Sequence, residues 1–259
     1  MSSSHRPRGC GFTLVELMLA LLVLGLAMTS IAVPLAAHLQ MRRVDETRRL
    51  IDEAREAVMG FAAASGRLPC PASEASNGLE SFAPGGDAAN GNCATFHDGY
   101  LPAATLGLAP LDSEGYLRDA WGTSRNRVRY AVFGGGSAVN AVSNPLTRSG
   151  GMQAATLPGL ADASHYLLIC AAAAGTSAAS CGAATNQLTR RAAFVVLSLG
   201  PNAGATPAPN SDEARNLSGT PVFVHREPSV APGNEYDDIV HWVPIHLVVS
   251  RMLAAGRLP

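Results

Sequence analysis

The stretch Gly9–Leu26, "GCGFTLVELMLALLVLGL", decides how the rest of this 259-residue chain is interpreted. Between residues 12 and 39, Glu16 is the one formally charged residue. About 20 apolar residues suffice to cross a bilayer, so residues 12–39 predict a membrane-spanning helix. Arg6 and Arg8 precede the run and predict a cytoplasmic N-terminus. A carboxylate at the centre of a span costs on the order of 3 kcal/mol, so Glu16 calls for a partner.

Three other interpretations of this stretch are weaker. A secretory signal peptide has an apolar region of about 7–15 residues and then a cleavage site, whereas this run is longer and continues as a helical pattern. A lipoprotein signal is excluded because Cys10 precedes the apolar run. A plain membrane anchor remains, but it leaves Glu16 without a reason.

Residues 40–65 predict an amphipathic continuation of the same helix. Apolar and small residues recur there at steps of three and four, and charged residues fill the opposite side. Ser65 and Gly66 end the pattern, and Pro69 prevents it from resuming. We therefore expect one helix over residues 12–64 and a globular head over residues 66–259. The periodic positions are Val44, Thr47, Ile51, Ala54, Val58 and Phe61.

The N-terminal stretch resembles the class III signal of type IV prepilins and type II secretion pseudopilins. The resemblance implies that residues 1–11 are a leader, which a membrane peptidase removes between Gly11 and Phe12 before it N-methylates Phe12. It also gives Glu16 a role in filament assembly. In a stack of N-terminal helices, the Glu16 carboxylate can face the terminal ammonium of Phe12 on a neighbouring subunit, so that two costly charges become a pair.

Composition narrows the chemistry of the head. The formal charge is −1, and all nineteen cationic residues are arginine, which excludes lysine-dependent Schiff-base chemistry and the P-loop. We expect no nucleic-acid partner because no basic face is evident. Four cysteines follow the helix, and they allow three pairings among which the sequence cannot choose. We favour sequential pairing in an oxidising compartment, Cys70 with Cys93 and Cys170 with Cys181.

The sequence of the head predicts an α+β fold, in which the long N-terminal helix packs on a small antiparallel sheet with long loops. This is the pilin-like fold that the resemblance implies. "RVRYAVF", "HYLLICAAAA" and "RAAFVVLSLG" have the patterns of strands, and "DDIVHWV" predicts an edge strand. "GYLPAATLGL" predicts a short packed turn or helix, and residues 245–255 predict a terminal helix.

Three stretches of the head are similar to the major pseudopilin subgroup: "DAWGTSRNRVRY", "VVLSLGPNAG" and "DIVHW". In that subgroup the last two frame a calcium site, and calcium prefers several carboxylate and carbonyl oxygens. The resemblance implies Asp238, Asn202 and the Leu199 or Ser198 carbonyl as ligands. Asn202 stands where an aspartate is usual and the intervening loop is longer, so the loop acids are alternative ligands: Asp212, Glu213 and Asp237.

No catalytic arrangement stands out, so we expect no enzyme. The seven histidines are scattered, and "GGGSAVN" lacks the second glycine of a nucleophile elbow. The leading hypothesis is a structural subunit, a pseudopilin or minor pilin, held in the bacterial inner membrane with its head in the periplasm. It would join a periplasmic filament for type II secretion, with other pilin subunits, the prepilin peptidase, the secretion platform and the assembly ATPase as partners. The alternative is a minor pilin of a type IV pilus whose head binds a ligand or surface.

Overall fold

The computed structural model describes residues 13–162 and 166–258, and the side chains of residues 27–37 are outside the described part. The chain divides into two compact units, Met1–Val44 and Asp45–Pro259. The fold is α+β, with an N-terminal helix and a curled mixed sheet.

The N-terminal helix, α1, runs from Leu14 to Ser65. It begins after Thr13, whose Oγ1 accepts a hydrogen bond from the Glu16 backbone N–H at 3.3 Å. It ends where Gly66 adopts a left-handed conformation (φ 78°) and donates to the Ala62 carbonyl at 2.9 Å. The expected helix over residues 12–64 therefore matches α1 to within two residues, although Phe12 lies outside the described residues.

The membrane span expected over residues 12–39 includes Phe12 and the side chains of residues 27–37, which lie outside the described part of the chain. Among the described residues, the structure contains no helix with the length and apolar character needed to cross a bilayer.

Six strands form the main sheet, in the order β1-β2-β6-β5-β7 with β8 also paired to β6. The central strand, β6, is 12 residues long, and its second half is buried in the core cluster and paired on both edges, with β2 and with β8. The sequence predicts an antiparallel sheet, and this prediction is wrong at one pairing. Strand β5 pairs with β7 in parallel. Between them the chain forms β6 and helix α5 (Asp212–Asn216), and it then returns beside β5 in the same direction. The strands are β1 (Gly99–Tyr100), β2 (Arg129–Val132), β5 (Leu167–Cys170), β6 (Gln187–Ser198), β7 (Val222–Val224) and β8 (Ile239–Pro244).

Short elements surround this sheet. A separate two-stranded hairpin pairs β3 with β4. Helix α6 follows β8 directly and ends before Gly256, as the sequence predicted. The remaining elements are β3 (Ala138–Val139), β4 (Val142–Ser143), α2 (Ala103–Leu106), α3 (Gly151–Ala155), α4 (Leu157–Asp162), a 3₁₀ turn η1 (Ala184–Asn186), α5 (Asp212–Asn216) and α6 (Ile245–Ala254).

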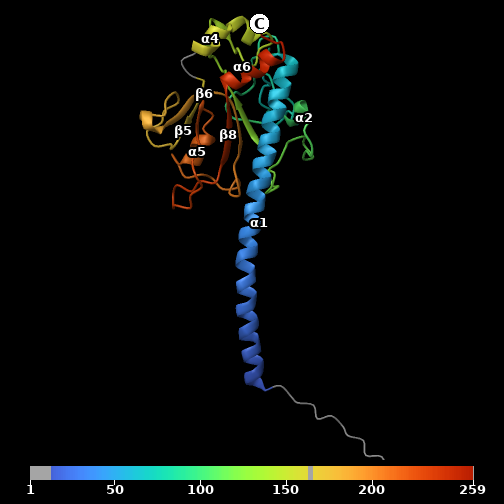
Figure 1. Cartoon of the computed structure of the whole chain (residues 1–259), viewed down its shortest axis with the longest axis vertical. Helices are drawn as coiled ribbons and strands as arrows, with labels where there is room; N and C mark the ends of the chain where they lie inside the picture. The colour runs from blue at the N-terminus through green and yellow to red at the C-terminus, as the bar shows by residue number, and fades with distance from the viewer. Residues whose placement is uncertain (1–12, 163–165, 259) are drawn as a thin grey trace, which may run out of the picture. The chain divides into compact units, whose positions relative to one another are not determined.

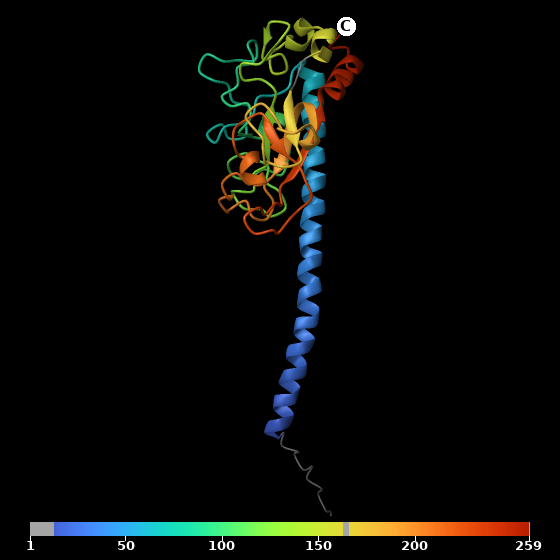
Figure 2. The same cartoon turned by 90° about the vertical axis from the view of Figure 1, so that its left-hand side faces the viewer.

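The second unit buries one face of α1 against the sheet. Thr47, Ile51, Ala54 and Val58 are fully buried, and three of them belong to the same apolar cluster as the residues of β6. Figures 1 and 2 show this part of α1 running along the sheet, with β8 and α6 beside it. A polar contact holds α1 in the same position: Asp52 Oδ1 of α1 lies 3.3 Å from Nδ1 of His241 in β8. The amphipathic period of residues 40–65 therefore identified the packed face of α1.

Two disulfides close the long loops of the head. Cys70 pairs with Cys93 across 23 residues, and Cys170 pairs with Cys181 across 11. This is the sequential pairing that we favoured among the three alternatives. The loop of residues 71–92 is rich in glycine and turn residues, and the loop of residues 171–180 consists mostly of alanine. Both loops bury little apolar surface, so a covalent tie replaces the packing that they lack.

Candidate functional site

The N-terminal motif lies only partly within the described residues. Gly11 and Phe12, the predicted sites of cleavage and methylation, are outside them. Glu16 is exposed in the first turn of α1. Thr13 and Glu16 also have the spacing of a capping box, in which a threonine precedes a glutamate by three residues. Sequence reasoning missed this second role for Glu16, although the T-x-x-E pattern could have indicated it.

The first unit exposes a dense apolar surface. Large apolar side chains between Leu14 and Leu26 are more than half exposed; they are Leu14, Val15, Leu17, Met18, Leu19, Leu21, Leu22, Val23, Leu24 and Leu26. Soluble monomeric proteins rarely expose apolar patches of this size. The patch over residues 14–26 therefore indicates a surface that lipid or another molecule covers.

The second candidate site is built around the end of β6. Asp119 begins a turn before β2, and its Oδ1 accepts from the Trp121 backbone N–H at 2.9 Å. Its Oδ2 accepts from Ser198 Oγ at 2.6 Å and from Asn126 Nδ2 at 3.0 Å. Asn126 Nδ2 also donates to the Gly200 carbonyl at 2.6 Å. The "DAWG" turn thereby holds the chain where it leaves β6.

Three carboxylates gather beside this exit. Glu213, Asp237 and Asp238 each place an oxygen within 4.8 Å of the others. Glu213 lies on α5, whose N-terminus is capped by Ser211 Oγ, an acceptor for the Ala214 N–H at 3.2 Å. The two aspartates immediately precede β8. Residues 24 and 25 positions apart in the chain are brought together because α5 packs on β7 and Glu213 Oε1 accepts a hydrogen bond from the Asp237 N–H at 3.1 Å.

Burial makes this acidic cluster (Glu213, Asp237 and Asp238) electrostatically unfavourable as it stands. Burial, reinforced by the Glu213 carboxylate, raises the pKa of Asp237 to about 7. Burial also raises the pKa of Asp238 well above its usual range, although a hydrogen bond from Asn216 Nδ2 at 2.7 Å opposes the rise. Asp237 Oδ1 is buried and has no hydrogen-bond partner among the described residues. An orphaned carboxylate oxygen beside two more carboxylates fits a bound cation.

The donor set is the kind that calcium prefers. Three carboxylates supply hard oxygen ligands, and a bound Ca²⁺ would supply positive charge that offsets their repulsion. Asp238 belongs to the cluster, as the resemblance implied. The Leu199 backbone immediately precedes Gly200, which borders Asp237. Calcium as the occupant stays a prediction.

Two of the predicted ligands are placed differently. Asn202 lies against the cluster, but its Nδ2 donates to both oxygens of Glu213, at 2.9 and 3.1 Å, so its amide nitrogen faces the site. Asp212 is engaged elsewhere: its Oδ1 accepts from the Ala173 N–H at 2.6 Å, and its Oδ2 lies 2.6 Å from Arg226 Nε. The cluster therefore uses the loop acids Glu213 and Asp237, which the sequence offered as alternatives.

Comparison with known proteins identifies the N-terminal segment alone. Residues 6–32 match the family described as the prokaryotic N-terminal methylation motif. Searches of curated proteins and of solved structures found no match. The chain therefore carries a type IV pilin-like N-terminal signal, which is typical of structural filament subunits rather than enzymes and implies a prepilin peptidase and other pilin subunits as partners.

Proposed function

We propose that this chain is a pseudopilin or minor pilin that assembles through its N-terminal helix into a periplasmic filament for type II protein secretion. The observation that carries the proposal is the match of residues 6–32 to the methylation motif, with Glu16 five residues into the mature chain. In this scheme residues 1–11 are the leader, 12–39 anchor the chain in the inner membrane, 40–65 are the amphipathic half of the helix, and 66–259 form the periplasmic head.

The exposed apolar surface over residues 14–26 supports this scheme. Lipid covers such a surface before assembly, and the helices of neighbouring copies cover it afterwards. Inside that apolar environment an ionised Glu16 needs a counter-charge, which the new terminal amine of a neighbouring copy supplies. The two disulfides are consistent with a head exported to an oxidising compartment.

A calcium ion held by Glu213, Asp237 and Asp238 is part of the proposal. The ion would join α5 to the start of β8 and so stiffen the long loop between β6 and β8. The motivating observation is the buried cluster with an orphaned oxygen on Asp237.

Glu16→Gln tests the filament role against the capping role. Glutamine serves in a capping box as glutamate does, so the variant keeps the helix start and loses only the charge. We expect sheared filaments from cells that express Glu16→Gln to fall to background. The matched control is Thr13→Ala, which removes the cap and keeps the charge, and which should still assemble. Wild-type assembly by Glu16→Gln would refute the proposed pairing of charges.

A minor pilin of a type IV pilus is the second candidate. The loop of residues 71–92, tied by Cys70–Cys93, and the loop of residues 203–234 are where a ligand- or surface-binding site would lie. The two candidates separate by phenotype: deletion of a secretion subunit blocks export of proteins across the outer membrane, whereas deletion of a minor pilin reduces surface pili.

A further inference from the structure

An apolar pocket of about 250 Å³, here called the α4–α6 pocket, lies between these two helices at one end of the main sheet (Figure 1). Sites for small molecules and cofactors usually enclose about 300–1,000 Å³, so this pocket suits a side chain of another protein better than a free ligand. Its apolar lining comes from both helices and consists of Leu157, Leu160, Ala161, Ile245, Val249 and Leu253.

Arg191 supplies the positive charge at the α4–α6 pocket. It lines the pocket from β6, and its Nη2 donates a hydrogen bond to the Ala161 carbonyl of α4 at 2.7 Å, which holds the guanidinium there. A guanidinium has five N–H donors, so most of them remain for another acceptor. Within the described part of the chain Arg191 forms no ion pair. The pocket therefore favours a segment that presents an apolar side chain beside a carboxylate.

The turn that leads into β8 presents such a pair of side chains. Val230 is 93% exposed, more than any other large apolar side chain that the structure describes. Ser229 and Tyr236 pair across the turn, and the backbone N–H of each donates to the carbonyl of the other at 2.8 Å. Val230 and Glu235 are the next residues inward from this bridge, so they lie opposite each other. Glu235 is exposed and has no ion-pair partner among the described residues.

Contacts at its base hold this turn, residues 229–236, in place. Arg226 Nη2 donates to the Asn234 carbonyl at 2.8 Å. Tyr236 is fully buried, and its hydroxyl donates to the Val224 carbonyl at 2.8 Å. Single exposed apolar residues are common on protein surfaces. Val230 differs from them because it stands on a fixed turn with a carboxylate opposite it, which is the arrangement that the α4–α6 pocket favours.

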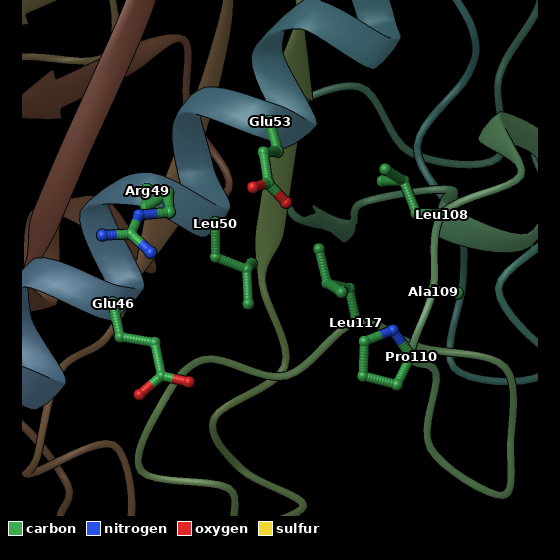
Figure 3. Close-up of a pocket in the computed structure, with 8 residues that line it drawn as sticks. All are labelled: Glu46, Arg49, Leu50, Glu53, Leu108, Ala109, Pro110 and Leu117. Atoms are coloured by element: carbon green, nitrogen blue, oxygen red, sulfur yellow. The ribbon is translucent and has the colours of Figure 1, made fainter.

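The pocket beside α1 does not match this turn. Figure 3 shows the Glu46 and Glu53 carboxylates on the pocket side of α1. Arg49 lines the same pocket, so two carboxylates stand against one guanidinium and the pocket is negative. It would repel Glu235, because like charges brought together across an interface are unfavourable. Arg191 gives the α4–α6 pocket the opposite charge.

The turn and the α4–α6 pocket lie at opposite ends of β8. The turn comes before Ile239, where β8 begins, and α6 follows Pro244, where β8 ends. A strand of this length spans about 20 Å, so the two surfaces of one chain do not meet each other. Each is therefore available to the complementary surface of another copy.

We propose that the α4–α6 pocket receives Val230 of a second copy of this chain, with Glu235 of that copy on Arg191. The inference rests on the proposed function, because the filament is what brings the heads of successive copies together. Pocket and turn are different surfaces of one head, so the contact is heterologous. A heterologous contact that does not close into a ring repeats from copy to copy and extends a filament.

Exchanging the two charges tests this contact. Full-length Arg191→Glu, full-length Glu235→Arg and the chain that carries both substitutions are each expressed in cells that have the assembly machinery and lack the wild-type chain. Each single variant turns an attraction into a repulsion at every contact, so the yield of sheared filaments should fall at least about fivefold. The double variant restores opposite charges, and its yield should return to within about twofold of the wild type.

Arg190→Glu is the matched control. Arg190 is exposed beside Arg191, but adjacent residues of a strand point to opposite faces, and Arg190 does not line the pocket. This variant should assemble as the wild type does. The inference is overturned if either single variant keeps the wild-type yield, if the double variant stays as low as the single ones, or if Arg190→Glu falls as far as Arg191→Glu. In each case wild-type filaments still form and the filament function stands, whereas a wild-type chain that forms no filament refutes both.

A photo-cross-linker at position 230 gives a measurement that does not depend on yield. Val230 is replaced in the full-length chain by p-benzoylphenylalanine, which an exposed position accommodates. Assembled filaments are irradiated, and cross-linked dimers are isolated and digested. We expect position 230 to be joined to residues 157–161 or 245–253 of the other copy. Filaments that give no dimers, or dimers joined at other positions, would overturn the inference.

Discussion

Asp237 closes over Gly200 at the exit of β6. A Cβ added to Gly200 would lie 2.4 Å from Asp237 Oδ1 and 2.6 Å from the Asp237 carbonyl oxygen. Gly200 also has a φ of 65°, in the left-handed region that side chains disfavour. The acidic cluster therefore keeps its shape because this position has no side chain.

Gly200→Ala should destabilise the head by about 1–3 kcal/mol, through both backbone strain and the clash with Asp237. Chemical denaturation of the full-length chain in detergent, followed by tryptophan fluorescence, measures the loss. The matched control is Gly136→Ala, which has a φ of 92° and nothing within 4 Å of an added Cβ. It should cost less, since it carries the strain alone. Equal costs at the two positions would contradict the packing described for Asp237.

Calcium should stabilise the folded chain. If the acidic cluster binds Ca²⁺ in the folded state only, a concentration 100 times the dissociation constant adds about 2.7 kcal/mol to the free energy of unfolding. Asp238→Asn should remove this gain, because it takes a charged oxygen from the buried cluster. The control Glu235→Gln alters an exposed acid and should keep the gain. A melting temperature that does not respond to calcium or to a chelator would exclude the site.

The disulfides should contribute unequally to stability. Replacing both Cys170 and Cys181 by serine should cost about 2–4 kcal/mol. The Cys70–Cys93 bridge closes a loop about twice as long, which adds about 0.6 kcal/mol of loop-closure entropy to its loss. Cys10→Ser is the control: it precedes the proposed cleavage site and should leave the mature chain unchanged. Denaturation midpoints measured with and without reductant check both values.

His97 should contribute a loss of stability in mild acid, opposite in sign to the contribution of Asp237, whose raised pKa favours the folded state as pH falls. Burial lowers the pKa of His97 below its usual 6.5, against an opposing hydrogen bond to the Gly219 backbone. Its Nε2 is buried without a partner in the described structure, and the neighbouring Asp98 is already paired with Arg129. As pH falls below about 6.5, His97 becomes protonated in the unfolded chain while it stays neutral in the folded chain. The free energy of unfolding therefore decreases as pH falls through that value. Above it, His97 is neutral in both states and contributes no slope.

His97→Asn isolates this effect from other titrating groups. The difference in unfolding free energy between the wild type and the variant should shrink as pH falls from 7 to 5. A difference that stays constant over this range would show that His97 takes up its proton equally well in both states.

Periodicity and turn chemistry accounted for much of the fold. The period of three and four over residues 44–61 marked the buried face of α1, and the apolar runs marked β2, β5, β6 and β8. These signals are local, so they are present in the sequence itself. The parallel pairing of β5 with β7 is not local: β7 is three residues long, and its partner lies about 50 residues earlier. No periodicity in so short a segment indicates the direction of its neighbour.

The candidate metal cluster was anticipated only in part for the same reason. Asp238 came from the resemblance, whereas Glu213 reaches the site because Ser211 caps α5 and α5 packs on β7. Asn202 lies in the expected place, but its amide donates to Glu213. Which loop acids converge depends on how a long connection folds back, and composition alone does not encode that path.

The mass of the mature N-terminal peptide tests the central claim most directly. We predict that a chain isolated from its host begins at Phe12 and carries one methyl group on the terminal amine. A chain that retains residues 1–11, or that begins at any other position, would contradict the account, because Glu16 would then face no new amine in a neighbouring copy.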